Sequence, residues 1–258
     1  ITQWRYRTII CRILTMNGPF FAIIAALLFG LSSPIAKSLL TAIDPWLLAG
    51  LLYLGSGIGM AIIYAVRGAL PSENHLQKIV KSEFSWLAGV TLSGGVLGPI
   101  FLMYGLTRTS ASTTALLLNL EGVFTATVAW IIFLEHYDRR IILGMMAIIF
   151  GGSIRSWSDG RTWAGMAGPI FVALACMSWA VDNNLTRKIS LNDPILLTMI
   201  KSLVAGATNF ALALSLGAKL PPLHFIAIAG VIGFLCYGLS IVCFILALRN
   251  LGASRTGA

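Results

Sequence analysis

Residues 46–66 read WLLAGLLYLGSGIGMAIIYAV, a run of 21 residues without a charged side chain. The hydrocarbon core of a bilayer is roughly 30 Å thick, and a helix of about 20 apolar residues crosses it. This stretch therefore has the length and composition of a membrane-spanning helix. Seven similar segments surround it, so the expected spans are 19–40, 46–66, 84–106, 111–134, 140–156, 164–185, 195–217 and 223–248.

Helix-stopping residues separate these segments. Asp-Pro pairs stand before the second segment at 44–45 and before the seventh at 193–194, and Pro-Pro at 221–222 stands before the eighth. The apolar runs, such as 147–150, do not alternate with polar residues as the strands of a membrane β-barrel do. We therefore predict an all-α membrane protein, a polytopic helical bundle.

The composition excludes most other classes of protein. Apolar residues make up 57% of the chain and charged residues 10%, against roughly 25% in soluble domains. These values argue against a soluble enzyme, a disordered chain, a disulfide scaffold and a nucleic-acid binder. The net charge of +9 comes from Lys and Arg spread singly or in pairs, so we interpret it as a signal for membrane orientation.

The four cysteines show no metal-binding spacing, and three of them lie in apolar segments, where a cysteine acts as a small buried hydrophobe. They are Cys11, Cys176, Cys236 and Cys243. No metal and no cofactor are expected.

The segment 1–18 is expected to be a cytoplasmic N-terminal extension. Either Met16 is the natural start, or the preceding residues form a basic arm. Arg5, Arg7 and Arg12 ahead of an apolar stretch could also belong to a signal peptide. The length of the first span and the seven spans after it favour a membrane helix.

The chain contains a weak internal repeat. Besides the two Asp-Pro pairs, Ser-Ala-Ser at 110–112 opens the fourth span, and Gly-Ala-Ser at 252–254 stands where a ninth would begin. The spacing predicts a first five-helix unit over 19–156 and a second, C-terminally incomplete unit over 157–258.

The distribution of charge agrees with an inverted repeat. Because each unit has an odd number of helices, five, the second unit enters the membrane from the opposite side. Equivalent loops of the two units therefore lie on opposite faces of the membrane. With the N-terminus inside, the inner side holds Arg5, Arg7, Arg12, Arg67, Lys78, Lys81, Arg139, Arg140, Arg187, Lys188, Arg249 and Arg255. The outer loops hold Arg108, Arg155, Arg161 and Lys219. Positive-inside bias therefore predicts a cytoplasmic N-terminus in the cell (inner or plasma) membrane.

Three stretches carry a family resemblance. They are YGLTRTSAS at 104–112, LLLNLEGVFTA at 116–126, with Glu135 closing that span, and WAVDNNLTR at 179–187. With the repeat, they make residues 19–258 resemble the EamA-type transporters of the drug/metabolite transporter superfamily. Many relatives have a proline near position 122, where this chain has Glu121-Gly122.

The resemblance implies an inverted five-plus-five repeat of ten helices, of which a ninth and a tenth are not among the eight segments. It also implies export or exchange of small metabolites, amino acids or drugs across the inner membrane. It does not name the substrate.

Glu121 is the most informative charged residue, because it lies near the middle of the fourth span. A charged group at a helix centre costs roughly 3 kcal/mol on insertion scales. Thr114 and Thr125 stand seven residues before it and four after it, on the same face of a helix. Glu121 could take up and release a proton as access alternates, or it could stay protonated in one interhelical hydrogen bond.

Lys201 lies in the seventh span, with Thr208 and Asn209 on its face. It could pair with Glu121, but we favour a side chain that reaches the cytoplasmic interface. Lys37, near the outer end of the first span, is expected to reach the interface in the same way.

The densest polar cluster within a span is Asp182-Asn183-Asn184, between Trp179 and Arg187. It is either a polar substrate or gate site, or an interfacial cap beyond a span that ends near Val181. The cap is the favoured reading.

Two glycine pairs fit the G-x-x-x-G pattern, which allows close helix packing, and they are Gly55 with Gly59 and Gly94 with Gly98.

Three classes of function remain. A secondary transporter that works by alternating access fits the repeat, the sparse polar residues and the absence of a Walker A sequence. An intramembrane enzyme needs a nucleophile or metal motif, and the sequence has no H-E-x-x-H and no G-x-S-x-G. A non-transporting scaffold is the third class. We therefore predict a transporter rather than an enzyme, with membrane lipid, a small-molecule substrate and a coupling proton as its partners.

Overall fold

The computed structural model describes residues 18–69, 83–133 and 163–253, together with 143, 144, 146, 147, 150, 151 and 256. In this part of the chain, seven helical segments are long and apolar enough to cross a membrane. The predicted all-α bundle is confirmed. The fifth predicted span, 140–156, and the turn that carries Glu135 lie largely outside the described residues.

Four spans are single helices, and three are composite. The single helices are α2 (Gly18–Leu39), α3 (Pro45–Ala69), α9 (Trp163–Ile189) and α10 (Pro194–Ser215). The composite spans are α4 (Phe84–Val90), η2 (Thr91–Leu97) and α5 (Gly98–Arg108), then α6 (Ala111–Leu117) and α7 (Leu120–Phe133), then α11 (Leu223–Ile232), η3 (Gly233–Leu239) and α12 (Ser240–Leu251). The segments η2 and η3 are π-helical, a form that is frequent at functional sites.

The two Asp-Pro pairs begin helices in the same way. Asp44 Oδ1 accepts the backbone N–H of Trp46 at 2.9 Å, and Asp193 Oδ1 accepts that of Ile195 at 2.9 Å. Each aspartate is followed by a proline at the first helical position. The missing N–H of proline costs no helical hydrogen bond there, and its fixed φ suits the helix. The predicted starts of α3 and α10 are therefore observed.

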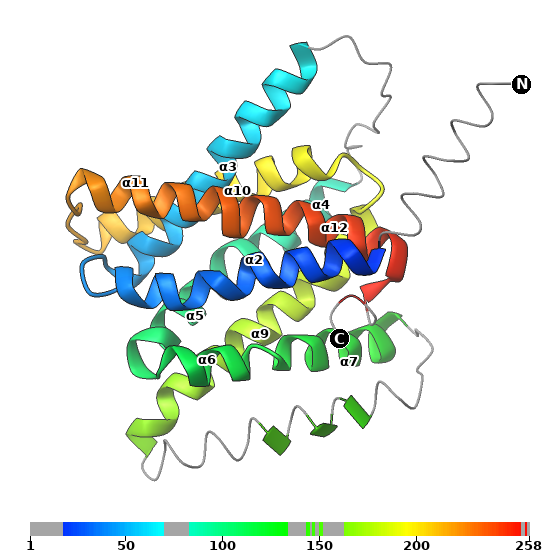
Figure 1. Cartoon of the computed structure of the whole chain (residues 1–258), viewed down its shortest axis with the longest axis horizontal. Coiled ribbons are helices and arrows are strands. Elements are labelled where there is room, and N and C mark those ends of the chain that lie inside the picture. Colours follow the sequence, from blue (N-terminus) through cyan, green and yellow to red (C-terminus); the bar gives the residue numbers. More distant parts are fainter. Residues whose placement is uncertain are drawn as a thin grey trace, which may run out of the picture.

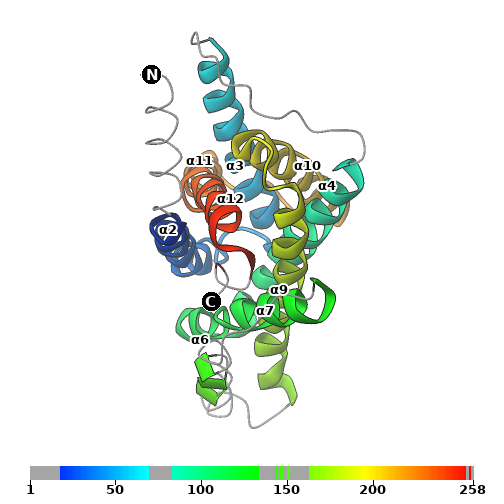
Figure 2. The same ribbon diagram turned by 90° about the vertical axis from the view of Figure 1, so that its right-hand side faces the viewer.

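The helices pack in pairs that are distant in the sequence. The main contacts join α3 to α10, α5 to α9, α2 to α12, α3 to η3 and α7 to α9. In Figures 1 and 2, α2 lies beside α11 and α12 on one side of the bundle, while α6, α7 and α9 form the other side.

Glycines permit the closest of these approaches. A Cβ at Gly55 would overlap the backbone of Gly230, and a Cβ at Gly59 would overlap the ring of Phe234. Gly94 and Gly98 face Asp182 and Trp179 of α9 in the same manner. Both G-x-x-x-G pairs therefore lie at helix contacts within this chain.

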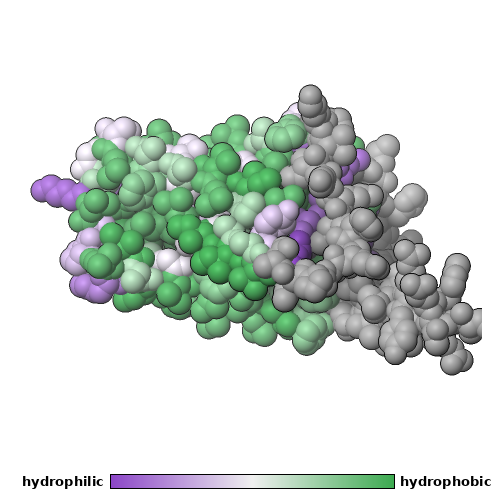
Figure 3. Space-filling model, turned by 90° about the horizontal axis from the view of Figure 1, so that it is seen from above, coloured by the Kyte–Doolittle hydropathy of each residue, from purple (hydrophilic) through white to green (hydrophobic). Residues whose placement is uncertain are grey.

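The outer surface is apolar. Large side chains such as Leu27, Ile131 and Leu223 are 64%, 65% and 79% exposed, respectively. Figure 3 shows a face on which hydrophobic residues predominate, with hydrophilic residues gathered at its left end. Such a surface suits lipid rather than water, so the chain is a multi-pass membrane protein.

Candidate functional site

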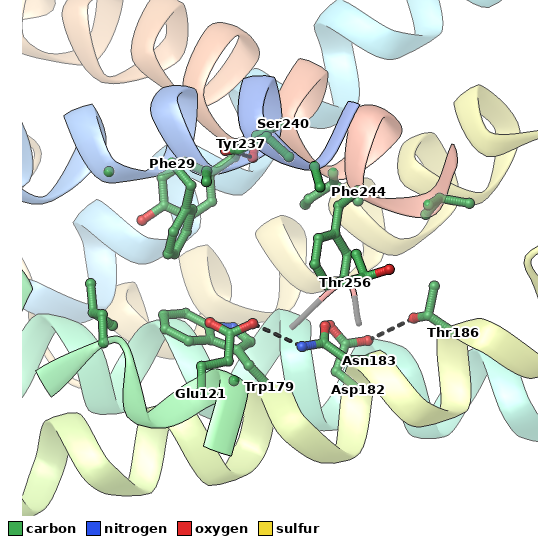
Figure 4. Close-up of a pocket in the computed structure, with 18 of the residues that line it drawn as sticks. Phe29, Glu121, Trp179, Asp182, Asn183, Thr186, Tyr237, Ser240, Phe244 and Thr256 are labelled. Carbon is green, nitrogen blue, oxygen red and sulfur yellow. Dashed lines mark hydrogen bonds between the residues drawn. The ribbon is translucent and has the colours of Figure 1, made fainter. Parts of the chain in front are cut away.

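A cavity of about 350 Å³ lies inside the bundle, a size typical of small-molecule sites. Its walls come from α2, α3, α6, α7 and the turn between them, α9, α10, η3 and α12. Five of the eight predicted site residues line it, namely Glu121, Trp179, Asp182, Asn183 and Lys201. Figure 4 shows Glu121, Asp182 and Asn183 on one side of this space and Phe29, Tyr237 and Phe244 on the other.

Glu121 reaches the cavity because the fourth span is interrupted there. The backbone N–H groups of Asn119 and Glu121 bond three residues back, to Leu116 and Leu118, and a turn separates α6 from α7. The span predicted over 111–134 is present, but the sequence did not predict its interruption at this point. The interruption places Glu121 in the first turn of α7, beside N–H groups without helical partners.

Asn183 of α9 holds the carboxyl of Glu121. Its Nδ2 donates to Glu121 Oε1 at 2.8 Å and to Thr125 Oγ1 at 3.1 Å. One amide thus joins two of the predicted polar residues of α7 to the polar cluster of α9.

Asp182 and Lys201 form an ion pair between α9 and α10. Both residues are buried, with 5% and 6% of their surface exposed, and Thr186 Oγ1 donates to Asp182 Oδ1 at 3.1 Å. Lys201 therefore neither reaches the interface nor pairs with Glu121, and both expectations are wrong. The pairing explains how a lysine can stay inside a span.

The polar cluster is not a cap at the end of its span. The helix α9 continues past Val181 to Ile189, and Asp182, Asn183 and Asn184 are all buried. Asn184 Nδ2 donates to the carbonyls of Thr125 and Ala180 at 3.0 and 2.9 Å. The cluster instead joins α9 to α7 and α10 inside the bundle.

The other three predicted residues lie outside the cavity wall. Thr125 is buried under Asn183, and Thr114 Oγ1 bonds to the carbonyl of Ser110 at 2.9 Å in its own helix. Asn209 Nδ2 donates to the carbonyl of Gly95 at 3.0 Å. Thr114 therefore does not line the cavity with Glu121, as a common polar face would require.

An aromatic wall completes the cavity, and of its four residues only Trp179 was predicted. The ring centroid of Phe29 lies 5.3 Å from that of Trp179 and 5.6 Å from that of Tyr237. Tyr53 lies 5.5 Å from Tyr237. These rings come from α2, α3, α9 and η3, so no local pattern could have grouped them.

The π-helical segment η2 supports this wall. The carbonyl of Gly94 accepts hydrogen bonds from Tyr53 Oη at 2.8 Å and from Trp179 Nε1 at 3.1 Å. A Cβ at Gly94 would also overlap the carboxylate of Asp182. Gly94 therefore positions two rings and leaves room for the ion pair.

One buried hydroxyl among the cavity-lining residues has no partner. Ser33 Oγ makes no hydrogen bond among the described residues, and Ser33 is 1% exposed. Pro34 lies inside α2 and has no backbone N–H, so the carbonyl of Gly30 lacks its usual helical hydrogen bond. Gly30 also lines the cavity.

The polar contacts differ at the two ends of the bundle. At one end, Lys37 is half-buried and donates to the carbonyls of Leu106 and Thr109, the latter at 2.9 Å, at the C-terminal end of α5. At the other end, Arg67 pairs with Asp193. The cavity extends toward this second end, because Thr186 in the last turn of α9 lines it.

The chemistry of the cavity suits an amphipathic solute. The carboxyl groups of Glu121 and Asp182 lie beside Trp179 on one side, and Phe29, Tyr237 and Phe244 lie on the other (Figure 4). Within the described residues, no group of three His, Cys, Asp or Glu side chains could hold a metal ion.

Comparison with known proteins identifies the family. Residues 16–155 match the EamA-like transporter family. The chain is also 26% identical to an uncharacterized transporter of Methanothermobacter thermautotrophicus, over 93% of this chain and 74% of that protein. A solved crystal structure superposes with a TM-score of 0.70 at 15% identity, covering 94% of this chain and 82% of that one, which supports the fold alone. With more than half of its length matching the family, this membrane transporter belongs to the EamA-like transporter family.

Proposed function

We propose that the chain is a secondary transporter that exports a small organic solute by alternating access, and that the cavity beside Glu121 and Asp182 is its substrate site. The observation that carries the proposal is the gathering of three charged side chains around one cavity inside the membrane. Each such group costs roughly 3 kcal/mol at a helix centre. Binding and transport of a polar solute would explain why the chain keeps these charged side chains inside the membrane.

The proposal includes an inverted repeat of two five-helix units, 19–156 and 157–258. Its support is that Asp-Pro caps start α3 and α10, and that π-helical segments interrupt the span that follows in each unit. The two units would rock about the cavity between them.

The orientation proposed from charge places the N-terminus in the cytoplasm. Gly18 packs near Leu251, and Arg249 of α12 donates to the carbonyl of Ser190 at 2.8 Å, so these residues share one end of the bundle. The cavity extends toward that end. A solute would therefore enter from the cytoplasm, as export requires.

Glu121 is the proposed site of proton exchange. It lines the cavity, and its described hydrogen bond is the one from Asn183 Nδ2. A carboxyl group on the wall of a cavity can exchange a proton with water that enters the cavity, and this exchange would change as access to the cavity alternates.

Counterflow in proteoliposomes tests the proposal. Vesicles loaded with an unlabelled amino acid, amine or organic acid should accumulate the same labelled solute faster than empty vesicles, for at least one of these classes. Glu121→Gln should abolish this exchange or its pH dependence, whereas Asp44→Asn, which keeps the cap of α3, should not. Equal rates with and without the protein, for every class, would refute the transport proposal.

A further inference from the structure

The charges on the cavity wall are unequal in number. In the described part of the chain, two carboxyl groups and one amine line the cavity, on Glu121, Asp182 and Lys201. The amine is committed to Asp182, which it meets as an ion pair. With both acids ionised, the wall therefore carries one negative charge that has no paired cation among the described residues, on Glu121.

Lys201 occupies the place that an amine of a ligand would take. Its Nζ meets Asp182 Oδ2 at the cavity, and Thr186 donates to the other oxygen of the same carboxylate at 3.1 Å. Gly94 packs directly against the Asp182 carboxylate, since a Cβ at Gly94 would overlap it, and this contact restricts the position of the ion pair. A second positive group of a ligand would have to displace this lysine.

The remaining walls suit the body of an organic cation. The rings of Phe29, Trp179 and Tyr237 are in edge contact, and cations bind favourably to aromatic faces. Ala25 and Phe244 add an apolar surface from α2 and α12. A solute with one ammonium group and an apolar body would match both the charge and the walls.

We propose that the site takes amphipathic organic solutes with a single positive charge, and that Lys201 sets this number by standing in for a second substrate amine. The inference rests on the proposed transport function and names its substrate class. Lys201 is accordingly a specificity-determining residue, and its removal uncovers Asp182 for a second amine.

The test uses four probes that share one aromatic ring. Phenethylamine carries one positive charge, para-xylylenediamine two, phenethyl alcohol none and phenylacetate a negative charge. Binding to the purified full chain in detergent is measured by calorimetry, and counterflow in proteoliposomes. The wild-type protein should prefer phenethylamine over the other three by about tenfold or more, the factor expected for one charge-assisted hydrogen bond.

Lys201→Met should reverse the preference, so that para-xylylenediamine binds about tenfold more tightly than to the wild-type protein. The double variant Lys201→Met with Asp182→Asn should restore the preference for the single charge. Lys219→Met, which removes an exposed lysine of the loop after α10, should bind as the wild type does.

A second variant covers the case in which Lys201→Met does not fold. Asp182→Asn frees Lys201 to neutralise Glu121, so this variant should lose phenethylamine binding to the extent that Glu121→Gln does. Full binding by Asp182→Asn, or no gain for the diamine in a folded Lys201→Met, overturns the inference. If amines fail in the wild type while another solute exchanges, the substrate class is wrong and the transport function stands. If nothing exchanges, the transport function itself fails.

Discussion

Asn183 Nδ2 donates to Glu121 Oε1 at 2.8 Å, across the contact between α9 and the first turn of α7. The same nitrogen donates to Thr125 Oγ1 at 3.1 Å. The carboxyl group at the centre of the proposed mechanism is therefore held by an amide from the proposed second unit. A movement of α9 against α7 would change the surroundings of this carboxyl directly.

Asn183→Ala should impair transport more than folding. The substitution removes a hydrogen bond to a charged group, worth about 1.5–3 kcal/mol, and should lower the rate of counterflow by about tenfold or more. Asn184→Ala is the matched control, since Asn184 bonds only to the carbonyls of Thr125 and Ala180 in the described structure. It should lower thermal stability in detergent with little change in the exchange rate per folded molecule. Equal losses of transport in the two variants would contradict the role given to Asn183.

Glu121→Gln should remove the pH dependence of transport. The amide keeps the shape and can still bond to Asn183, but it cannot release a proton. Exchange by the wild-type protein should vary with pH as Glu121 gains and loses its proton, whereas the variant should give a flat profile at a lower rate. The measurement is counterflow across a series of matched internal and external pH values. A variant with the pH profile of the wild type would exclude Glu121 as the proton site.

Gly94→Ala should destabilise the protein and stop transport. The added methyl group would overlap the carboxylate of Asp182, and such overpacking typically costs about 1–3 kcal/mol. Gly230→Ala is the control, because a Cβ there meets no atom within 4 Å. Thermal unfolding in detergent should show a lower midpoint for Gly94→Ala and an unchanged or higher one for Gly230→Ala. Similar midpoints would show that Gly94 does not need to be small.

Asp193 should contribute more as a helix cap than as an ion-pair partner. In its pairing with Arg67, 32% of the arginine side chain and 3% of the aspartate side chain are accessible, and a pair that is open to solvent on one side contributes about 1 kcal/mol. Asp193→Asn keeps the cap on Ile195 and should cost little, whereas Asp193→Ala should cost about 1 kcal/mol more. Unfolding midpoints in detergent measure both. An equal cost for the two substitutions would show that the cap contributes nothing.

The helices could be predicted because their signals are local. Apolar runs long enough to cross a bilayer, and the Asp-Pro pairs at 44–45 and 193–194, each lie within a few residues. The interruption at Leu118 and Asn119 had no such signal, since it contains neither glycine nor proline. In the structure, Asn119 Nδ2 donates to the carbonyls of Ala115 and Leu116 at 3.2 and 2.9 Å, and these bonds stabilise the turn.

The charged residues of the candidate site were predicted, but their pairings were not. Glu121, Asp182 and Lys201 were recognisable because charged residues inside spans need a reason. Their partners depend on how α9 and α10 are rotated against each other, which hydropathy does not report. Tyr53 and Tyr237 were missed, because a tyrosine in an apolar span is unremarkable until its neighbours from other helices are known.

A cysteine placed on the cavity wall gives the most direct test of the proposal that this cavity is the transport site. Gly30 lines the cavity, and a Cβ there meets no atom within 4 Å. In a chain with its native cysteines replaced, Gly30→Cys should react with a water-soluble thiol reagent, the reaction should be slowed by substrate, and the label should stop counterflow. Leu31 is 58% exposed on the outer surface, so substrate should not change the rate at which Leu31→Cys is labelled. Labelling of Gly30→Cys that substrate does not slow, with transport intact after labelling, would contradict the account.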